Sequence, residues 1–212
     1  MKNRTSQVLF GYWNDVRGDR MAPGRFEIEP SRIAPILPET FILERIDSGV
    51  FRFRLAGTRI CEQFGRELRG ENFVAFFAND EQRLIERDLG QISAQGGVGH
   101  IVIEATTATD KKVEFELLLL PLVHTHQVVN RILGAASPLA QPPWLGHERL
   151  TVHRLISHDL IWPAGRRHAI AERMSAPPPA ALATPNARIV AANRRTFRVY
   201  EGGLGKGTDS KH

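Results

Sequence analysis

Two histidines, His124 and His126, have a spacing that could support metal chemistry. Residues two apart in a strand lie on the same side, about 7 Å apart, as paired metal ligands do. However, both histidines fall at the tip of a predicted hairpin, and no acidic or cysteine ligand is nearby in the sequence. A solvated loop is the simpler interpretation, so the sequence predicts no metal site.

Two arginines, Arg52 and Arg54, alternate with the apolar residues Phe51, Phe53 and Leu55. This alternation is typical of a half-buried strand with both arginines on its outer face. There they could contact an anionic ligand or a partner helix. The competing interpretation is that both arginines are simply solvated, since a long arginine side chain keeps its charged end in water.

Motifs of catalysis are missing from the chain. It contains neither Gly-x-Ser-x-Gly nor His-Glu-x-x-His. The closing Gly203-Leu-Gly-Lys206-Gly-Thr208 is similar to a phosphate-binding loop, but a glycine follows the lysine where that loop needs Ser or Thr. We therefore expect a binding protein and not an enzyme.

The arginine-bearing strand leads into a short predicted helix. Gly57 ends the strand, and Thr58 is expected to cap a helix whose apolar face carries Ile60, Cys61 and Phe64. Gly65 supplies the left-handed residue with which many helices end.

The remaining elements follow from periodicity and turn residues. An amphipathic helix with Leu9, Tyr12, Trp13 and Val16 on one face is predicted to end near Gly18. Strands are predicted at 41–46, 100–106, 112–123 and 131–137. A longer helix should run from a cap at Asn79, with Gln82 completing a capping box, to Gly96.

The strand at 112–123 indicates how the first helix is used. Glu114 and Glu116 form its polar side, but residues 117–120 are all leucine and therefore apolar on both faces. Such a strand needs a cover on its outer side, and the first helix can supply it. The alternative is that the helix packs on a second copy of itself. A further extended piece with Leu150, Val152 and Ile156 follows Pro142-Pro143.

Size and charge limit the class of protein. The chain has 212 residues and a net charge of +5, and its single cysteine excludes an internal disulfide. Residues 163–212 hold nine Lys and Arg against three Asp and Glu, so the rest of the chain is close to neutral. No apolar run approaches the 18 to 20 residues or so that span a bilayer. We expect no membrane contact and a cytoplasmic location.

The order of elements predicts an α+β domain, a five-stranded antiparallel sheet with helices on one face. The strand, the short helix and the following Gly65-Arg-Glu-Leu-Arg-Gly70 resemble the middle of a PAS domain, the small sensory fold of bacterial signalling. Trp13, Pro23 and Pro30, with the stretch 51–58, are further similar to a proteobacterial family of stand-alone PAS proteins.

The resemblance implies sensing and protein contact, and it supplies no catalytic residues. A PAS ligand pocket would lie between sheet and helices, which makes Phe53, Phe64, Phe73 and Phe76 candidates, although a filled hydrophobic core predicts the same residues. Haem-binding PAS proteins take a ligand from the region of His100, but nothing else in the sequence supports haem. The only cysteine, Cys61, lies outside the position that covalent flavin attachment requires, so neither cofactor is expected and any ligand is unknown.

Three segments result: an amphipathic helix (1–22), a PAS-like sensory domain (23–162) and a flexible, disordered basic tail rich in Pro, Ala and Gly (163–212). The predicted function is that of a non-catalytic signalling or scaffolding protein that binds a small ligand, a protein partner or both. We expect a homodimer formed through the first helix. The alternative is a nucleic-acid-associated adaptor that uses the basic tail.

Overall fold

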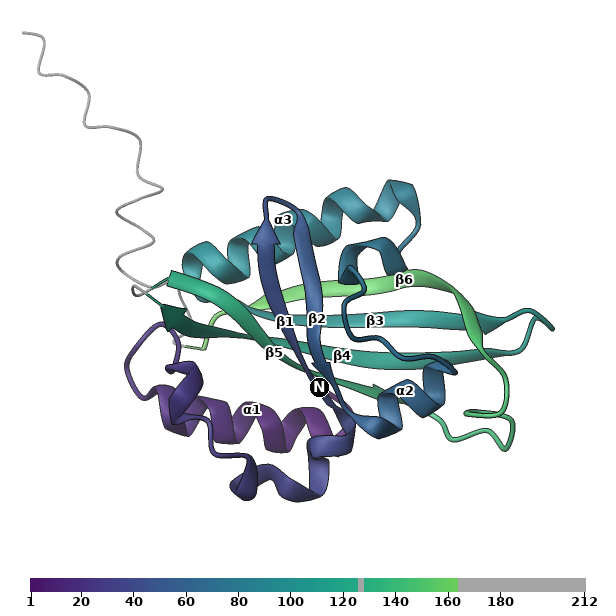
Figure 1. The fold of residues 1–212 in the computed structure, drawn as a ribbon, viewed down its shortest axis with the longest axis horizontal. Coiled ribbons are helices and arrows are strands. Elements are labelled where there is room, and N and C mark those ends of the chain that lie inside the picture. The colour runs from purple at the N-terminus through teal and green to yellow at the C-terminus, as the bar shows by residue number, and fades with distance from the viewer. Residues whose placement is uncertain (126–127, 164–212) are drawn as a thin grey trace, which may run out of the picture. The chain divides into compact units, whose positions relative to one another are not determined.

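The computed structural model describes residues 1–125 and 128–163 (Figure 1). A six-stranded antiparallel sheet, in the order β2-β1-β5-β4-β3-β6, organises this part of the chain. Its strands are β1 Thr40–Asp47, β2 Val50–Ala56, β3 Val98–Thr107, β4 Lys112–Thr125, β5 Val128–Pro138 and β6 Leu150–Ile161. The predicted α+β class is confirmed. The tail predicted at 163–212 lies outside the described residues, apart from Pro163.

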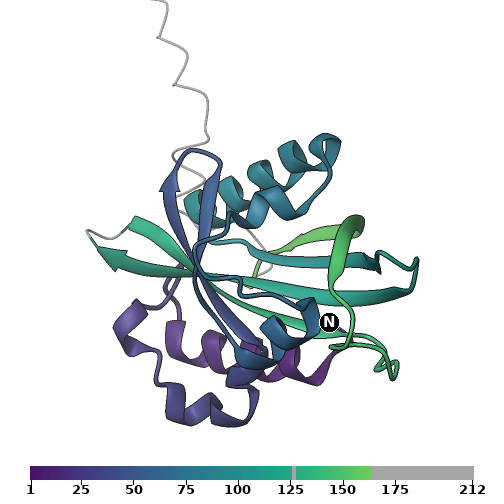
Figure 2. The same cartoon turned by 45° about the vertical axis from the view of Figure 1, so that its right-hand side comes forward.

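Helical segments cover both faces of the sheet. The face we call inner carries α2 (Thr58–Phe64), η3 (Phe73–Phe76) and α3 (Asn79–Gln95). The outer face carries α1 (Arg4–Arg17) and the 3-10 segment η2 (Pro30–Glu39), preceded by the short η1 (Arg25–Glu27). Figures 1 and 2 show α1 and α3 on opposite sides of the sheet. Each face therefore has its own apolar core.

The prediction of five strands is wrong, because β6 adds a sixth strand beside β3. Two of its apolar residues do not lie on its buried side. Val152 and Ile156 are 58% and 49% exposed, whereas His153 is 4% exposed. A register shift lies opposite Val102 and Ile103, so the alternation along β6 is broken. The sequence therefore indicated an extended segment but not a strand of the sheet.

Two predicted helix caps are also wrong. The N-cap of α2 is Gly57 and not Thr58, and the N-cap of α3 is Ala78 and not Asn79; neither has a side-chain cap. Gly57 has a different role. A Cβ there would lie 2.3 Å from the carbonyl oxygen of Pro38, so the close approach of η2 to the start of α2 requires glycine.

The apolar stripe of α1 packs on the outer face of the sheet. Leu9 and Trp13 are fully buried, Tyr12 is buried and Val16 is half-buried. The indole Nε1 of Trp13 donates a hydrogen bond to the carbonyl oxygen of Pro121, at 2.9 Å. Within one chain, α1 is thus the cover that Leu118 and Leu120, the outward-facing leucines of β4, need.

A buried carboxylate holds the start of α1 on the sheet. Glu116, fully buried on β4, accepts hydrogen bonds from the backbone N–H groups of Lys2, at 2.5 Å, and Asn3, at 3.1 Å. Nε2 of His100 lies 3.1 Å from the same carboxylate. Burial by itself raises the pKa of Glu116, but these hydrogen bonds outweigh it and the net pKa is lowered. Glu116 is thus not part of a solvated strand face, as its alternation with Glu114 suggested.

We predict that Glu116→Gln destabilises the fold by about 1–3 kcal/mol, because an amide replaces a charge that accepts backbone hydrogen bonds at a helix start. Urea unfolding monitored by circular dichroism measures the change. Glu114→Gln is the matched control, since Glu114 lies two residues earlier on the same strand face and is exposed. Equal midpoints for the two variants would contradict the anchoring role.

The left-handed conformation predicted for Gly65 is confirmed, with φ 66° and ψ 28°. A Cβ at this position would also lie 2.8 Å from Cα of Arg149, so any side chain meets backbone. Gly70 has φ 88°, but a Cβ there would have no atom within 4 Å. A substitution at Gly70 therefore measures the cost of a positive φ alone, whereas one at Gly65 adds the cost of steric overlap with Arg149.

We predict that Gly65→Asn destabilises the protein by about 1–3 kcal/mol and Gly65→Val by more, because both residues crowd Arg149 and valine also disfavours positive φ. Gly70→Asn should cost about 0.5 kcal/mol or less, since asparagine tolerates this region. Urea midpoints of the three variants decide the matter. A mild Gly65→Asn would mean that the packing on Arg149 is not tight.

Candidate functional site

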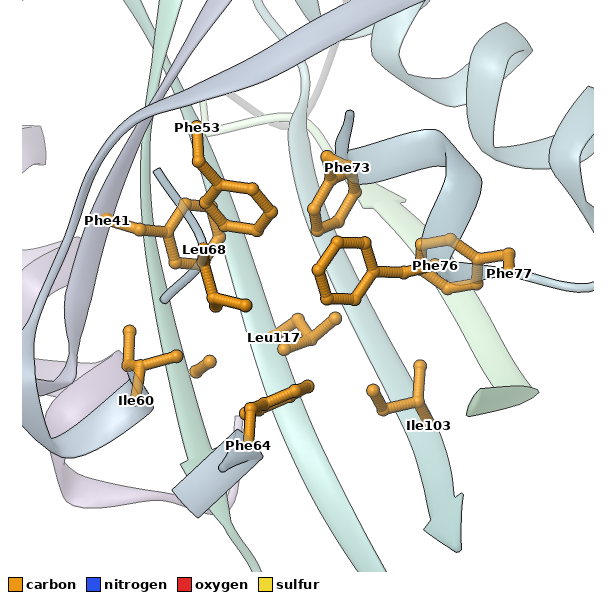
Figure 3. Close-up of a pocket in the computed structure, with 11 residues that line it drawn as sticks. Phe41, Phe53, Ile60, Phe64, Leu68, Phe73, Phe76, Phe77, Ile103 and Leu117 are labelled. Carbon is orange, nitrogen blue, oxygen red and sulfur yellow. The ribbon is translucent and has the colours of Figure 1, made fainter. Parts of the chain in front are cut away.

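The interior between the sheet and the inner helices is filled by phenylalanine rings (Figure 3). A cavity of about 20 Å³ remains there, lined only by apolar side chains. The four sequence-predicted pocket residues, Phe53, Phe64, Phe73 and Phe76, all line it. The other lining residues are Phe41, Ile60, Leu68, Phe77, Ile103, Leu117 and Ala136.

Ring-to-ring contacts hold this cluster together. The ring centroid of Phe53 lies 5.5 Å from that of Phe41, 5.8 Å from that of Phe73 and 5.4 Å from that of Phe76. Phe64, on α2, lies 6.3 Å from Phe76 on η3. Small-molecule pockets usually enclose about 300–1,000 Å³. The remaining space is close to that of a single water molecule, so the interior is a packed core in this conformation.

His153 borders this core and was not singled out from the sequence. Its imidazole ring stacks on Phe64, with centroids 5.3 Å apart, and lies 5.4 Å from Phe76. Nδ1 lies 3.2 Å from the carbonyl oxygen of Phe76 and can donate a hydrogen bond to it, while the buried Nε2 has no partner among the described residues. Burial lowers the pKa of His153 to about 4. The ring is therefore neutral near pH 7.

An arginine adds positive charge beside this histidine. The guanidinium of Arg66 lies over the ring of Phe76, 4.2 Å from its centroid, and pairs with Glu71 at 3.0 Å. Burial lowers the pKa of Arg66. Its charge adds to the cost of protonating His153. No sequence motif marks this pair, because the two residues come from distant segments.

A second hollow, of about 810 Å³, lies on the outer face near β1 and β2; we call it the arginine groove. Of the two arginines noted in the sequence, Arg54 lines it and Arg52 does not. Four arginines contribute to its surface. The lining residues are Arg25, Phe26, Ile42, Arg54, Leu55, Ala56, Glu67, Arg69, His124 and Arg131.

The other candidate residues are not brought together. His124 lies in the arginine groove with its ring centroid 5.3 Å from Phe26, and His126 lies outside the described residues. His100 contacts Glu116 on the outer face. Cys61 is half-buried on α2 and burial raises its pKa. Within residues 1–125 and 128–163, no group of three or more His, Cys, Asp or Glu could hold a metal ion.

The described residues thus form an antiparallel sheet with a helical cover on each face and an aromatic inner core. The chain belongs to the PAS domain family, whose model matches residues 1–137. The predicted resemblance is confirmed. Membership indicates a role in sensory signalling. The match ends at β5, so β6 lies beyond it.

No curated protein matches the chain. Among solved structures, the Rhodobacter sphaeroides LOV protein is 15% identical, with a TM-score of 0.40, over 55% of this chain and 71% of that one. The d2 variant of RsLOV is also 15% identical, with a TM-score of 0.39, over 49% of this chain and 60% of that one. In the described part of the chain, no helix is long and apolar enough to cross a membrane.

We predict that stability falls as the pH is lowered through the histidine range. The folded-state pKa of His153, about 4, lies below its ordinary value of 6.5, so the unfolded chain binds more protons between these values. At about 1.4 kcal/mol per pH unit, the loss between pH 7 and pH 5 should be about 2 kcal/mol. Urea midpoints across this interval measure it.

The variant His153→Gln should flatten this dependence, because glutamine keeps a donor for the Phe76 carbonyl but does not titrate. His147→Gln is the control, since His147 is exposed and its loss should leave the slope unchanged. A slope that survives in His153→Gln would assign the dependence to other groups.

Proposed function

We propose that this protein is a non-catalytic PAS-type signalling or scaffolding protein that passes its signal through protein–protein contacts. The observation that carries the proposal is the filled interior. Space of about 20 Å³ holds no organic ligand in this conformation, so the place where a PAS domain would take a ligand is occupied by the protein's own side chains. The surface is then where a partner is recognised.

The first helix is a poor dimer contact, because its apolar stripe already packs on the sheet. Trp13 is fully buried in this contact and is not available to a partner. A homodimer needs another apolar surface. The exposed residues Val152 and Ile156 of β6 supply one.

The outer side of β6 has the properties of a contact surface. β6 is an edge strand, and Val152 pairs in register with Thr106 on the side of β3 that faces away from the inner core. Arg154 lies between the two apolar residues in sequence, and it pairs in register with Glu104. The centres of protein interfaces are apolar and enriched in arginine, and their rims are polar. We place the contact with a second copy of the chain here.

The double variant Val152→Glu/Ile156→Glu tests this surface. Light scattering should give two copies for the wild-type chain and one for the variant, because four introduced carboxylates would repel across a twofold interface. Circular dichroism should show that the variant is folded. Ile46→Glu is the control, since Ile46 is 53% exposed at the far end of β1. A monomeric wild-type chain would contradict the homodimer.

A further inference from the structure

We propose that the arginine groove binds a nucleotide, that is, an anionic phosphate chain attached to a planar aromatic base. The groove is separate from the filled interior, and the proposal does not depend on the β6 contact. Its volume of about 810 Å³ lies within the usual range for small-molecule sites, about 300–1,000 Å³. The lining residues combine a positive charge, an apolar floor and an exposed aromatic ring.

The positive charge comes from four separate segments. Arg25 belongs to η1, Arg54 to β2, Arg69 to the segment after α2, and Arg131 to β5. Among the lining residues, Glu67 is the only carboxylate. The planar guanidinium group of an arginine can contact two phosphate oxygens through paired N–H donors, so arginines from separate segments can bind a phosphate chain together.

One of these arginines, Arg131, is fixed by an ion pair, Arg54 lies near the same carboxylate, and the other two keep their charge free. Glu44 lies 2.5 Å from Nη1 of Arg131 and orients that side chain, whereas the exposed Arg54 is 3.9 Å from the same carboxylate, too far for a hydrogen bond. The side chains of Arg25 and Arg69 form no ion pair or hydrogen bond with any described residue. The groove therefore keeps an excess of positive charge, which an anion can neutralise.

The aromatic component is Phe26. Its side chain is 82% exposed, yet its ring lies against His124 with centroids 5.3 Å apart. The backbone next to it is fixed, because the N–H of Val123 donates to the carbonyl oxygen of Pro23, at 3.0 Å. An exposed ring on a fixed segment beside arginines provides a stacking surface for a base.

The opposite wall of the groove is also held to the sheet. The N–H of Gly70 donates to the carbonyl oxygen of Phe53, at 2.8 Å, and the N–H of Phe53 donates to the carbonyl oxygen of Glu71, at 3.0 Å. Ile42, Leu55 and Ala56 complete the apolar floor. The walls are therefore preformed, which lowers the entropy cost of binding a small ligand.

Charge excludes the chain's own C-terminal segment as the occupant, because residues 163–212 are themselves basic. An acidic protein segment would satisfy the arginines. However, it would not require an exposed ring at the rim or a hollow lined by arginines from four segments. The ring and the hollow together favour a nucleotide over an acidic segment.

Calorimetric titration of the full-length protein tests the assignment. The probes are ATP and GTP, inorganic tripolyphosphate as the anion without a base, adenosine as the base without phosphates, and poly-glutamate. At least one nucleotide should bind about tenfold or more tightly than tripolyphosphate and adenosine, and its affinity should fall as salt is raised. The basic segment 163–212 is present throughout and gives a constant background.

Three variants locate the binding. Arg69→Gln should lower the affinity for both the nucleotide and tripolyphosphate about tenfold, whereas Phe26→Leu should lower only the affinity for the nucleotide. Arg52→Gln is the matched control, since Arg52 is an exposed β2 residue two positions from Arg54 that does not line the groove. Its binding should equal that of the wild-type chain.

The proposal is overturned if no nucleotide binds, or if Arg69→Gln binds as the wild-type chain does. If tripolyphosphate binds as tightly as the nucleotides and Phe26→Leu has no effect, the proposal is overturned and the groove is a site for a simple anion. Poly-glutamate that competes more strongly than any nucleotide would assign the groove to an acidic partner segment.

Discussion

The fold depends on covering the outer face of β4. Residues 117–120 are four leucines, so the strand is apolar on both sides and is stable only between two layers. The inner layer comes from helices that follow β2, and the outer layer from a helix that begins at the fourth residue. Glu116 makes the outer layer possible, because its buried carboxylate accepts hydrogen bonds from the backbone N–H groups of Lys2 and Asn3, just before α1. A helix start that lay on an apolar sheet without such an acceptor would leave these donors unsatisfied.

The inner layer solves a different problem. Its phenylalanines, on α2 and η3, interlock with those of β1 and β2 closely enough to leave almost no space. His153 packs among them as a neutral ring, and a charge there would have no acceptor at Nε2 among the described residues. Protonation of this ring at low pH therefore weakens the contact between β6 and the inner helices.

Much of this arrangement could be predicted from the sequence, because local periodicity specified it. The stripe of α1, the strand that bears Arg52 and Arg54, and the left-handed Gly65 are each encoded within a few residues. The sixth strand could not be predicted, since β6 exposes valine and isoleucine and buries a histidine. The burial of Glu116 could not be predicted either, because its alternation with Glu114 is typical of a solvated strand face. Its hydrogen-bond partners, Lys2 and Asn3, are distant in the sequence. The arginine groove joins four segments that no local pattern connects.

Glu39, at the end of η2, links elements on both sides of the sheet. Its Oε2 accepts hydrogen bonds from the hydroxyls of Thr5 on α1, at 2.5 Å, and Ser137 on β5, at 2.8 Å, while Oε1 pairs with Arg59 of α2 at 2.6 Å. A single carboxylate thus joins the helix that closes the phenylalanine core to the helix that covers the opposite face. A shift of α2 large enough to admit a guest into the core would either break the pair with Arg59 or pull on the first turn of α1. The two layers are therefore connected through one side chain, and a displacement of α2 would change the contacts that hold α1.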